Sequence, residues 1–504
     1  MSRIAELFYQ RIEDPLLERA RTDPHKPAVV DGDHVWSYDE LVARAQRLAA
    51  QLLQRGLEPG DRVAIYLDKT TSSVVALYGA WLAGGVAVPI NEGLRSRQVE
   101  HIVRDSGIRL FISESRKVTR LEPGAVGDAD VLEVDAGVTR EWTPLGLRGG
   151  QEAATILYTS GSTGRPKGIL ISHENLLAGA RIVARYLEIQ HDERLLSILP
   201  FSFDYGLNQL LTSVSTGATL VLQRSHFPAD IHKSLARHAI TAMAGVPPLW
   251  IQLLGDSSPL TQAAFPHLRY ITNSGGVFPT ELVARCRRVL PTTRLYLMYG
   301  LSEAFRSTYL PPEEVDRRPG SMGRAIPETE IYVLDEDGCE CGPGKVGELV
   351  HSGPTVALGY WRDPEATAAR FREHPFAPPG SAERVVYSGD LVRRDEEGFL
   401  YFVGRRDQLL KCQGFRVSPD EVEETIFASG LVAEVIVHGI PDPVSGQAIV
   451  AHVVPREVSA FSEQELLTYC RRQMPHYMVP RAVRTHTALP RTASGKIDRK
   501  GIAS

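Results

Sequence analysis

The chain has few cysteines, no long hydrophobic run and little net charge. Five cysteines among 504 residues are an odd number, which favours reduced thiols over a disulfide framework. No apolar stretch approaches the roughly 20 residues that span a bilayer, and residues 1–25 lack the apolar segment of a signal peptide. The net charge of -5 argues against a general nucleic-acid or anionic-membrane binder. These absences predict a cytoplasmic protein with no membrane span and no nucleic-acid partner.

Two cysteines lie close together in the sequence. Cys339 and Cys341 have a C-x-C spacing within a turn-like acidic and glycine-rich segment. A structural zinc ion takes four Cys or His ligands, and no second pair of such residues lies nearby in the sequence. The spacing therefore does not predict a metal site.

The length and the pattern of apolar residues predict more than one domain. A chain of 504 residues exceeds the size at which one hydrophobic core stops growing. A helix over 37–56, a strand over 62–67, a helix over 73–83 and a strand over 86–90 alternate, which predicts right-handed crossovers and a parallel sheet. Further strands are expected at Leu195–Pro200, Leu220–Leu222, Ala242–Val246 and Leu268–Asn273.

The pattern changes twice towards the C-terminus. Short strands and Gly/Pro turns over 329–360 predict a β-rich subdomain, and a compact α+β unit follows the charged segment 405–414. We therefore predict an α/β fold: a large N-terminal domain, residues 1–406, of mostly parallel sheets flanked by helices with a β-rich subdomain. Residues 407–504 form a small α+β C-terminal domain in this prediction.

Thr159–Gly168 is the most informative segment of the chain. It reads Thr-Ser-Gly-Ser-Thr-Gly-Arg-Pro-Lys-Gly and follows an apolar run over 153–158. Its glycines, hydroxyls and free N–H groups suit phosphate oxygens, and Arg165 and Lys167 add positive charge. It is not a Walker A loop, because Pro166 blocks a helix and a strand-like segment follows. The segment predicts a hairpin that closes over the phosphates of a nucleotide triphosphate.

This spacing resembles the phosphate loop of the adenylate-forming superfamily, which includes acyl-CoA synthetases, adenylation domains of peptide synthetases and beetle luciferases. Further segments resemble that family's motifs and occur in the family's order: Tyr299-Gly-Leu-Ser-Glu303, Tyr387-Ser-Gly-Asp390, Gly404-Arg-Arg-Asp407 with Lys411 and Gly414, and Pro490–Lys500. The resemblance extends from about residue 25 to residue 500.

The resemblance implies an AMP-forming carboxylate ligase. Such an enzyme activates a carboxylic acid with ATP to an acyl-adenylate and pyrophosphate, and then forms a thioester with coenzyme A. The alternative is a stand-alone amino-acid adenylation enzyme that loads the phosphopantetheine of a separate carrier protein. The implied cofactors are ATP, Mg²⁺, and coenzyme A or phosphopantetheine, and the small C-terminal domain is expected to rotate between the two half-reactions.

The resemblance also implies roles for individual residues. The implied nucleotide-binding residues are Thr159, Ser160, Gly161, Ser162, Thr163, Gly164, Lys167, Gly275, Tyr299, Gly300, Ser302, Asp390 and Arg405. Lys496 is the implied catalytic lysine, which contacts the carboxylate and the α-phosphate, and Thr163 and Glu303 are the implied catalytic Mg²⁺ ligands. Asp407 is expected to be the hinge, with Lys411 and Gly414 serving the thioester-forming state.

The acid-binding pocket is expected at Asp204, Tyr205, Asn208, Asn273 and Met298. Amino-acid-activating relatives have an aspartate at the place of Asp204, where it pairs the substrate ammonium, and a buried carboxylate without a partner is costly. Alternatively, Asp204 caps a helix that starts at Tyr205. The segment 414–423 resembles the acyl-CoA synthetase version instead, and no room follows Lys500 for a fused carrier. The sequence leaves the acid and the acceptor open.

Two other enzyme classes remain as alternatives. A luciferase-like oxygenase would oxidise its own adenylate and consume O₂. A phosphate-loop NTPase would release ADP and phosphate in place of AMP and pyrophosphate, so the nucleotide product separates it from a ligase.

Overall fold

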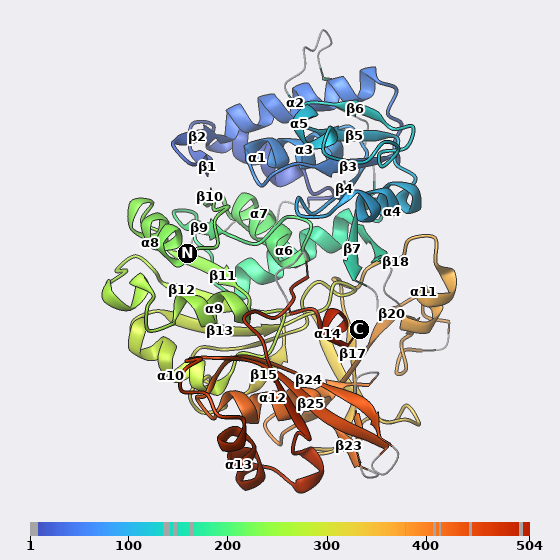
Figure 1. The fold of residues 1–504 in the computed structure, drawn as a ribbon. Helices are drawn as coiled ribbons and strands as arrows, with labels where there is room; N and C mark the ends of the chain where they lie inside the picture. Colours follow the sequence, from blue (N-terminus) through green and yellow to red (C-terminus); the bar gives the residue numbers. More distant parts are fainter. Residues whose placement is uncertain are drawn as a thin grey trace.

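The computed structural model describes residues 9–134, 142–144, 149–160, 166–378, 380–406, 410–412, 415–442, 446–492 and 497–503. Three sheets organise this part of the chain (Figure 1). The largest contains β1 (Pro27–Asp31), β2 (His34–Ser37), β9 (Arg194–Ser197), β10 (Thr219–Leu222), β11 (Ala242–Gly245), β12 (Tyr270–Asn273), β13 (Arg294–Tyr299), β14 (Thr308–Leu310), β15 (Ser321–Ala325), β16 (Glu330–Leu334), β17 (Val346–Ser352), β19 (Phe371–Glu373), β20 (Arg384–Arg394) and β21 (Leu400–Arg405).

The other two sheets are smaller. The second contains β3 (Arg62–Tyr66), β4 (Val86–Pro89), β5 (Leu110–Ser113), β6 (Asp130–Leu132), β7 (Ala153–Ser160), β8 (Pro166–Ser172) and β18 (Gly359–Tyr360). The third contains β22 (Leu410–Cys412), β23 (Phe415–Val417), β24 (Val432–Asp442), β25 (Gly446–Pro455) and β26 (Ala482–Thr485).

Helices connect and cover these sheets. The α-helices are α1 (Asp14–Thr22), α2 (Tyr38–Gln54), α3 (Thr71–Leu82), α4 (Ser96–Ser106), α5 (Ser115–Val118), α6 (His173–Tyr186), α7 (Asp204–Thr216), α8 (Pro228–Arg237), α9 (Pro247–Leu253), α10 (Thr280–Val289), α11 (Pro364–Arg370), α12 (Pro419–Phe427), α13 (Glu463–Gln473) and α14 (Arg499–Ala503). Two short 3₁₀ helices cover Pro259–Gln262 and His476–Met478.

The predicted parallel arrangement is confirmed. In the largest sheet β10, β9, β11, β12 and β13 are neighbours and run parallel, and in the second sheet β3 is parallel to β4 and β5. These strands are short and apolar, and residues in them such as Leu220 and Leu295 are buried. This is expected for parallel strands that are covered on both faces.

The predicted β-rich part is confirmed in its antiparallel pairing, with one difference at its end. Strand β16 pairs with β17, and β17 pairs with β20, in both cases antiparallel. However, Gly359 and Tyr360 form β18, which pairs with β8 of the second sheet. The segment 329–360 therefore does not form one unit, because its last residues extend the sheet that carries the phosphate-loop hairpin.

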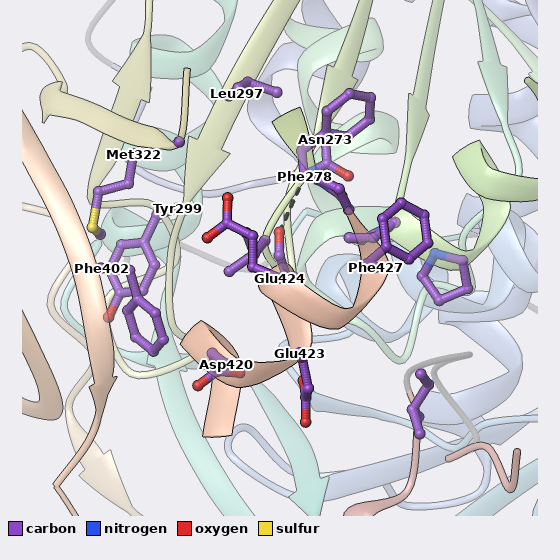
Figure 2. Close-up of a pocket in the computed structure, with 18 of the residues that line it drawn as sticks. Asn273, Phe278, Leu297, Tyr299, Met322, Phe402, Asp420, Glu423, Glu424 and Phe427 are labelled. Carbon is purple, nitrogen blue, oxygen red and sulfur yellow. Dashed lines mark hydrogen bonds between the residues drawn. The ribbon is translucent and has the colours of Figure 1, made fainter. Parts of the chain in front are cut away.

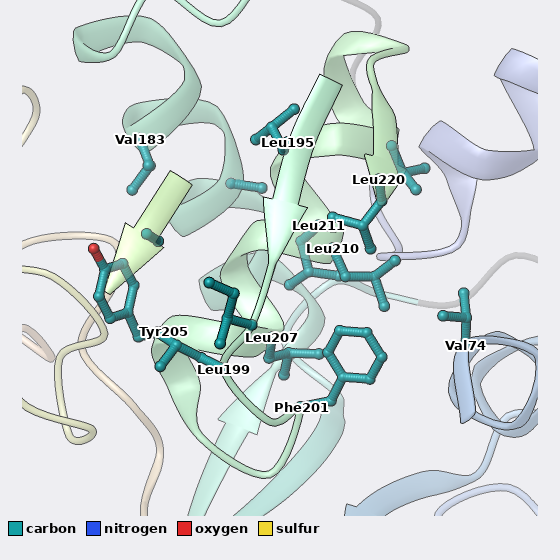
Figure 3. Close-up of a cluster of buried hydrophobic side chains, with 14 of the residues drawn as sticks. Val74, Val183, Leu195, Leu199, Phe201, Tyr205, Leu207, Leu210, Leu211 and Leu220 are labelled. Carbon is teal, nitrogen blue, oxygen red and sulfur yellow. The ribbon is translucent and has the colours of Figure 1, made fainter. Parts of the chain in front are cut away.

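Helix α7 is a buried element that carries the expected acid-pocket residues Asp204, Tyr205 and Asn208. Its residues from Asp204 to Val214 are all buried, which is typical of a helix covered on every side. Figure 3 shows its side chains Leu207, Leu210 and Leu211 among apolar residues of β9, β10 and the loop after β9. This packing fixes the start of α7, and thus Asp204 and Tyr205, deep inside the protein.

The C-terminal elements have a hydrophobic core of their own. Val422, Ile426, Val437, Ala451 and Leu466 are buried within it, and they lie on α12, β24, β25 and α13. Figure 1 shows these orange and red elements beside α10 and β15. The smaller α+β domain is therefore confirmed as part of the fold, while the boundary after residue 406 stays a prediction.

Three contacts join the C-terminal elements to α9 and α10. Arg456 Nη2 lies 3.3 Å from Glu281 Oε1, Thr280 Oγ1 donates to Glu424 Oε1 at 3.4 Å, and Ile251 packs against the C-terminal core. Each joins side chains that would separate if the domain turned. These contacts therefore belong to one particular arrangement of the two domains.

Two further observations on the described part of the chain concern membrane-spanning helices and the cysteines. It contains no helix that is both long enough and apolar enough to cross a membrane. The five cysteines are free thiols. Cys341 is buried, and neither it nor Cys339 belongs to any group of metal-ligating side chains among the described residues.

Candidate active site

A cavity of about 490 Å³ lies between the large sheet and the C-terminal elements. Figure 2 shows Asn273, Leu297 and Tyr299, at the carboxyl ends of β12 and β13, facing Glu424 and Phe427 of α12. Ligands of open α/β sheets bind outside the carboxyl ends of the strands. The cavity therefore occupies the place where this architecture holds a ligand.

Several of the residues expected to bind the nucleotide line this cavity. They are Gly275, Tyr299, Gly300, Asp390 and Arg405, and the expected acid-pocket residues Asn273 and Met298 line it as well. From the C-terminal elements the lining includes Asp420, Glu423, Glu424, Phe427, Glu434, Arg491, Ile497 and Arg499. The structure thus gathers residues from four of the five segments that the resemblance singled out.

Tyr299, Asp390 and Arg405 form one cluster. Strand pairing places Asp390 of β20 directly opposite Arg405 of β21, and Arg405 Nη1 lies 2.9 Å from Asp390 Oδ1. The Tyr299 hydroxyl donates to Asp390 Oδ2. Burial raises the pKa of Asp390, while the positive charge of Arg405 opposes that shift. The cluster presents a fixed carboxylate, which can accept two hydroxyl donors at once.

Gly389 gives this carboxylate its direction. Its φ angle is 73°, in the left-handed region that favours glycine. A Cβ at this position would lie 2.5 Å from Arg370 Nη1, and Arg370 itself donates to the Tyr387 carbonyl at 2.9 Å. The backbone conformation therefore favours a glycine before Asp390, and any side chain there would have to displace the Arg370 guanidinium.

The segment expected to hold phosphates has the predicted hairpin arms. Strands β7 and β8 run antiparallel, with Thr159 opposite Lys167 and the backbone of Ser160 opposite Pro166. Strand β8, not a helix, follows Pro166, so the distinction from a Walker A loop is confirmed for the described arms. Gly161, Ser162, Thr163 and Gly164 lie outside the described residues.

Glu303 and Lys167 meet at the ring of Tyr360. The Tyr360 hydroxyl donates to Glu303 Oε1 at 2.6 Å, and Lys167 Nζ lies 5.3 Å from the centroid of the Tyr360 ring. Lys167 Nζ also forms an ion pair with Asp363 at 3.4 Å. Ser302, beside Glu303, is half-buried. Tyr360 of β18 therefore links the phosphate-loop arm to the expected metal ligand, a role the sequence did not indicate.

The residues present fit a magnesium ion held mainly by phosphates. Mg²⁺ prefers oxygen ligands and is usually bound by one or two carboxylates together with substrate phosphates and water. Glu303 is half-buried with one oxygen fixed by Tyr360. Within the described ranges no group of three or more His, Cys, Asp or Glu side chains could hold a metal. A single carboxylate beside a phosphate loop agrees with that requirement.

Asp204 has a partner inside the protein. Arg306 Nη1 lies 3.3 Å from Asp204 Oδ2, and only 2% of the Arg306 side chain and 5% of the Asp204 side chain are exposed. Asp204 is the first residue of α7, the N-cap is Phe203, and no side-chain capping hydrogen bond is made. The helix-cap interpretation of Asp204 is therefore wrong, and the cost of an unpaired buried carboxylate no longer argues for an ammonium substrate.

Tyr205 and Asn208 lie with Asp204 on α7, behind the cavity wall. The Tyr205 ring stacks against Arg306, whose Cζ is 4.5 Å from the ring centroid, and its hydroxyl is hydrogen-bonded to Thr272. Asn208 is buried, and its Nδ2 has no hydrogen-bond partner among the described residues. None of Asp204, Tyr205 and Asn208 appears in the described lining of the 490 Å³ cavity, so the expected acid pocket is divided between the cavity and this inner group.

The inner group, which consists of Asp204, Tyr205, Asn208 and Arg306, depends on an unusual turn at Phe305. Its φ angle is 59°, a left-handed conformation that costs about 1 kcal/mol or more in a bulky residue. The Phe305 ring packs where a side chain on Gly179 would be, since a Cβ there would lie 2.4 Å from Phe305 Cδ1. This turn directs Arg306 inward, where its Nη1 also donates to the Phe305 carbonyl at 2.5 Å.

Sequence reasoning missed Arg306. The available signal was its place, three residues after Glu303, in the otherwise small and apolar stretch Ala304-Phe-Arg-Ser307. A buried arginine requires partners, and each unsatisfied buried donor costs about 1–3 kcal/mol. Arg306 therefore belongs to the candidate site by its burial and by its neighbours.

The C-terminal segment after Lys496 is anchored on α12. Arg499 Nη2 donates to Asp420 Oδ1 at 2.7 Å, and Arg499 Nη1 donates to Glu423 Oε1 at 2.6 Å. Ile497, the residue after Lys496 in the sequence, lines the cavity. Lys496, Asp407 and Gly414 lie outside the described residues, and Lys411 lies on β22 with its side chain outside the description. Their roles stay predictions.

We expect a Glu423→Gln variant to show a pH-dependent difference in stability from the wild type. Burial raises the pKa of Glu423 from 4.5 to about 7, despite the attraction of Arg499. The folded state therefore favours the protonated acid, and the contribution of Glu423 to stability is lost as pH rises from about 4.5 to about 7. The wild type should lose up to about 3 kcal/mol relative to the variant across that window.

The measurement is the thermal unfolding midpoint of both proteins between pH 5 and about pH 8. A Glu421→Gln variant, at an exposed position of the same helix, is the control for loss of one negative charge. A difference between wild type and Glu423→Gln that stays constant over this range would contradict the prediction.

Comparison with known proteins places the chain in a family. The family model described as "AMP-binding enzyme" matches residues 16–361, and the one described as "AMP-binding enzyme C-terminal domain" matches residues 421–496. The protein is 33% identical to novobiocin biosynthesis protein H of Streptomyces niveus, over 96% of this chain and 80% of that protein. It is 30% identical to a long-chain-fatty-acid–CoA ligase of Escherichia coli O6:H1, over 98% of this chain and 94% of that protein.

A solved structure shows the same fold. o-Succinylbenzoate coenzyme A synthetase from Bacillus subtilis has been solved with ATP and a magnesium ion and with its acyl-adenylate intermediate. It superposes with a TM-score of 0.86 at 29% identity, covering 97% of this chain and at least 98% of that one. The fold and the two-sided cavity thus define an adenylate-forming enzyme. The chain belongs to the AMP-binding enzyme family.

Proposed function

We propose that the protein is an AMP-forming acid–thiol ligase. It activates a carboxylic acid with ATP, releases pyrophosphate, and transfers the acyl group from AMP to the thiol of coenzyme A. In the first step a carboxylate oxygen attacks the α-phosphorus and pyrophosphate leaves. In the second step the thiol sulfur attacks the acyl carbon, the bond from that carbon to the phosphate oxygen breaks, and AMP leaves.

The observation that supports this proposal best is the cluster of Tyr299, Asp390 and Arg405 in the cavity between the two domains. In this proposal its carboxylate accepts the ribose hydroxyls and so helps to orient the α-phosphate for attack. Two anions must be brought together in this reaction, and positioning and charge neutralisation supply most of the acceleration. Bound Mg²⁺ supplies charge neutralisation at the phosphates. Lys167 and Lys496 supply further positive charge, and Glu303 and Thr163 are the metal ligands in this proposal.

The two domains divide this work. Residues 1–406 form the adenylating domain with the nucleotide and acid sites, and residues 407–504 form the mobile domain that carries Lys496. Asp407 is the hinge, and Lys411 and Gly414 serve the second half-reaction. The contacts of Arg456, Thr280 and Ile251 across the boundary must break when the domain turns. A cytoplasmic location stays a prediction from composition.

The test is the product analysis of the purified protein with ATP, Mg²⁺ and a panel of carboxylic acids. Formation of AMP and pyrophosphate that depends on the acid would agree with the proposal, and a thioester should then form with coenzyme A. Transfer only to the phosphopantetheine of a purified carrier protein would identify a carrier as the acceptor. Release of ADP and phosphate would contradict the proposal.

We expect a Glu303→Gln variant to lose about 100-fold in the rate of acyl-adenylate formation at low Mg²⁺. The neutral amide is a poor Mg²⁺ ligand next to phosphates, and loss of charge stabilisation in the transition state is typically this costly. Increasing the Mg²⁺ concentration should restore part of the rate.

The matched control is Tyr360→Phe, which removes the hydroxyl that donates to Glu303 Oε1 but keeps the carboxylate. This variant should keep most of the activity. Pyrophosphate exchange measured against Mg²⁺ concentration checks both. A Glu303→Gln enzyme with an unchanged Mg²⁺ dependence would show that Glu303 is not a ligand.

A further inference from the structure

One edge of a buried guanidinium has no partner. The Nη1 atom of Arg306 donates to the Phe305 carbonyl and lies 3.3 Å from Asp204 Oδ2. Its Nε and Nη2 atoms are buried and have no hydrogen-bond partner among the residues that the structure describes. Buried donors are nearly always satisfied, so this edge calls for an acceptor that the described protein residues do not provide.

The geometry of the edge indicates the kind of acceptor. The Nε–H and one Nη2–H of a guanidinium point in parallel along one side, a fork that matches a pair of oxygen lone pairs. A carboxylate meets both donors with two oxygens, and a carbonyl oxygen can accept from both. An apolar group satisfies neither donor. The edge therefore recognises an oxygen acceptor.

Arg306 lies directly behind the wall of the cavity. Gly300 lines the cavity, and a Cβ on Gly300 would lie 3.1 Å from Arg306 Cα and 3.5 Å from Arg306 Cδ. Met298, another lining residue, accepts a hydrogen bond from the Tyr186 hydroxyl at 3.0 Å. Gly300, a residue of the cavity wall, therefore packs directly against the backbone and the stem of Arg306.

Asp204 holds Arg306 and does not compete for the substrate. A substrate ammonium at Asp204 would lie beside the positive charge of Arg306 and would be repelled. Asn208, one turn further along the same face of α7, has its Nδ2 donor buried and unpartnered among the described residues. The unsatisfied donors of Arg306 and Asn208, together with a carboxylate that already has a cation, favour a substrate group that accepts hydrogen bonds.

We propose that the acid activated by this enzyme carries a second oxygen acceptor, a carboxylate or a carbonyl group, that binds the Nε–Nη2 edge of Arg306. The proposal rests on the proposed function, because it specifies the acid of that reaction. Acids with an apolar end leave both donors of Arg306 buried and unpaired. They are therefore poor substrates.

The test measures acid-dependent ATP–pyrophosphate exchange with matched straight-chain acids that end in a carboxylate, a carboxamide or a methyl group, at several chain lengths. We expect at least about 100-fold higher kcat/KM for the best acceptor-ended acid than for the best methyl-ended acid, because sites built to hydrogen-bond a polar group strongly reject analogues that lack it. A preference for the carboxylate or for the carboxamide identifies the charge of the group. Equal or better exchange with methyl-ended acids would overturn the proposal.

Arg306→Met should reduce the ratio of kcat/KM between acceptor-ended and methyl-ended acids towards one. Arg306→Lys keeps the positive charge but lacks the paired donors of the guanidinium, so it should restore only part of this ratio. Because Arg306→Met leaves Asp204 buried and unpaired, the double variant Asp204→Asn/Arg306→Met is measured alongside. ATP binding by calorimetry should be close to wild type in the double variant, which shows an intact nucleotide site. A ratio that survives in that variant would overturn the role of Arg306.

Failure of the proposed function would give a different experimental result from failure of this inference. Absence of exchange with every acid, in a wild-type protein that binds ATP, would contradict the ligase activity itself and this inference with it. Exchange with methyl-ended acids in preference to the others would contradict this inference alone.

Discussion

Replacing Lys496 with alanine is expected to reduce the rate of acyl-adenylate formation by about 10² to 10³-fold and to leave thioester formation from a supplied acyl-adenylate largely intact. A lysine beside the α-phosphate stabilises negative charge that develops only when the carboxylate attacks. In the proposed mechanism the C-terminal domain has turned before the second half-reaction, which therefore does not use Lys496. The loss should appear in kcat of pyrophosphate exchange more than in the affinity for ATP.

The structure supports this prediction through the residues on either side of Lys496. Ile497 and Arg491 line the cavity, and Arg499 is tied to Asp420 and Glu423 of α12. The described residues that flank positions 493–496 therefore lie at the wall of the cavity. A shift of even about 1 Å in a charged group that acts on the transition state is costly.

The matched control is Lys500→Ala, which removes the same charge from the same C-terminal segment, four residues further on. It should keep both half-reactions. Adenylate formation is measured by pyrophosphate exchange, and thioester formation by mixing the purified acyl-adenylate with coenzyme A. An equal loss of both half-reactions in Lys496→Ala would refute the role.

Much of the nucleotide site could be predicted from the sequence because its motifs are local. The hairpin of β7 and β8 follows from Pro166, which excludes a helix, and from the apolar runs on both sides of it. Tyr299 and Asp390 belong to short motifs, with Tyr299 as the last residue of β13 and Asp390 within β20. Their meeting, across 91 residues, could be expected only from the resemblance.

The inner group of the acid site could not be predicted in this way. The pairing of Arg306 with Asp204 spans 102 residues and depends on the left-handed turn at Phe305, which no glycine signals. The same holds for Tyr360, which joins Glu303 from a strand that the sequence pattern assigned to another subdomain. Side-chain contacts between distant elements depend on packing, and packing is not encoded in a local pattern.

The interpretation of Asp204 changed for a physical reason. From the sequence, a buried aspartate without a partner argued for a cationic substrate. In the structure that charge is compensated by Arg306, and the unsatisfied buried atoms of Arg306 and Asn208 are donors. The same helix position thus favours the opposite kind of substrate group.

Replacing Asp390 with alanine is expected to weaken ATP binding by about 100-fold. Hydrogen bonds to a charged group contribute about 1.5–3 kcal/mol each, and in the proposed site this carboxylate accepts from two ribose hydroxyls. Its loss also leaves Arg405 without the partner that lies at 2.9 Å. Isothermal titration calorimetry with ATP and Mg²⁺ measures the change directly.

Two comparisons separate a ribose contact from a general disturbance of the site. Tyr299→Phe removes the hydroxyl that orients Asp390 but keeps the carboxylate, so its affinity for ATP should fall by no more than about tenfold, the cost of one hydrogen bond. The wild type should bind 2′-deoxy-ATP or 3′-deoxy-ATP more weakly than ATP, whereas Asp390→Ala should bind all three alike, because the group that distinguishes the hydroxyls is gone. If Asp390→Ala still discriminated against both deoxynucleotides, the ribose hydroxyls would have to be bound elsewhere, and the cluster of Tyr299, Asp390 and Arg405 would have a structural role instead.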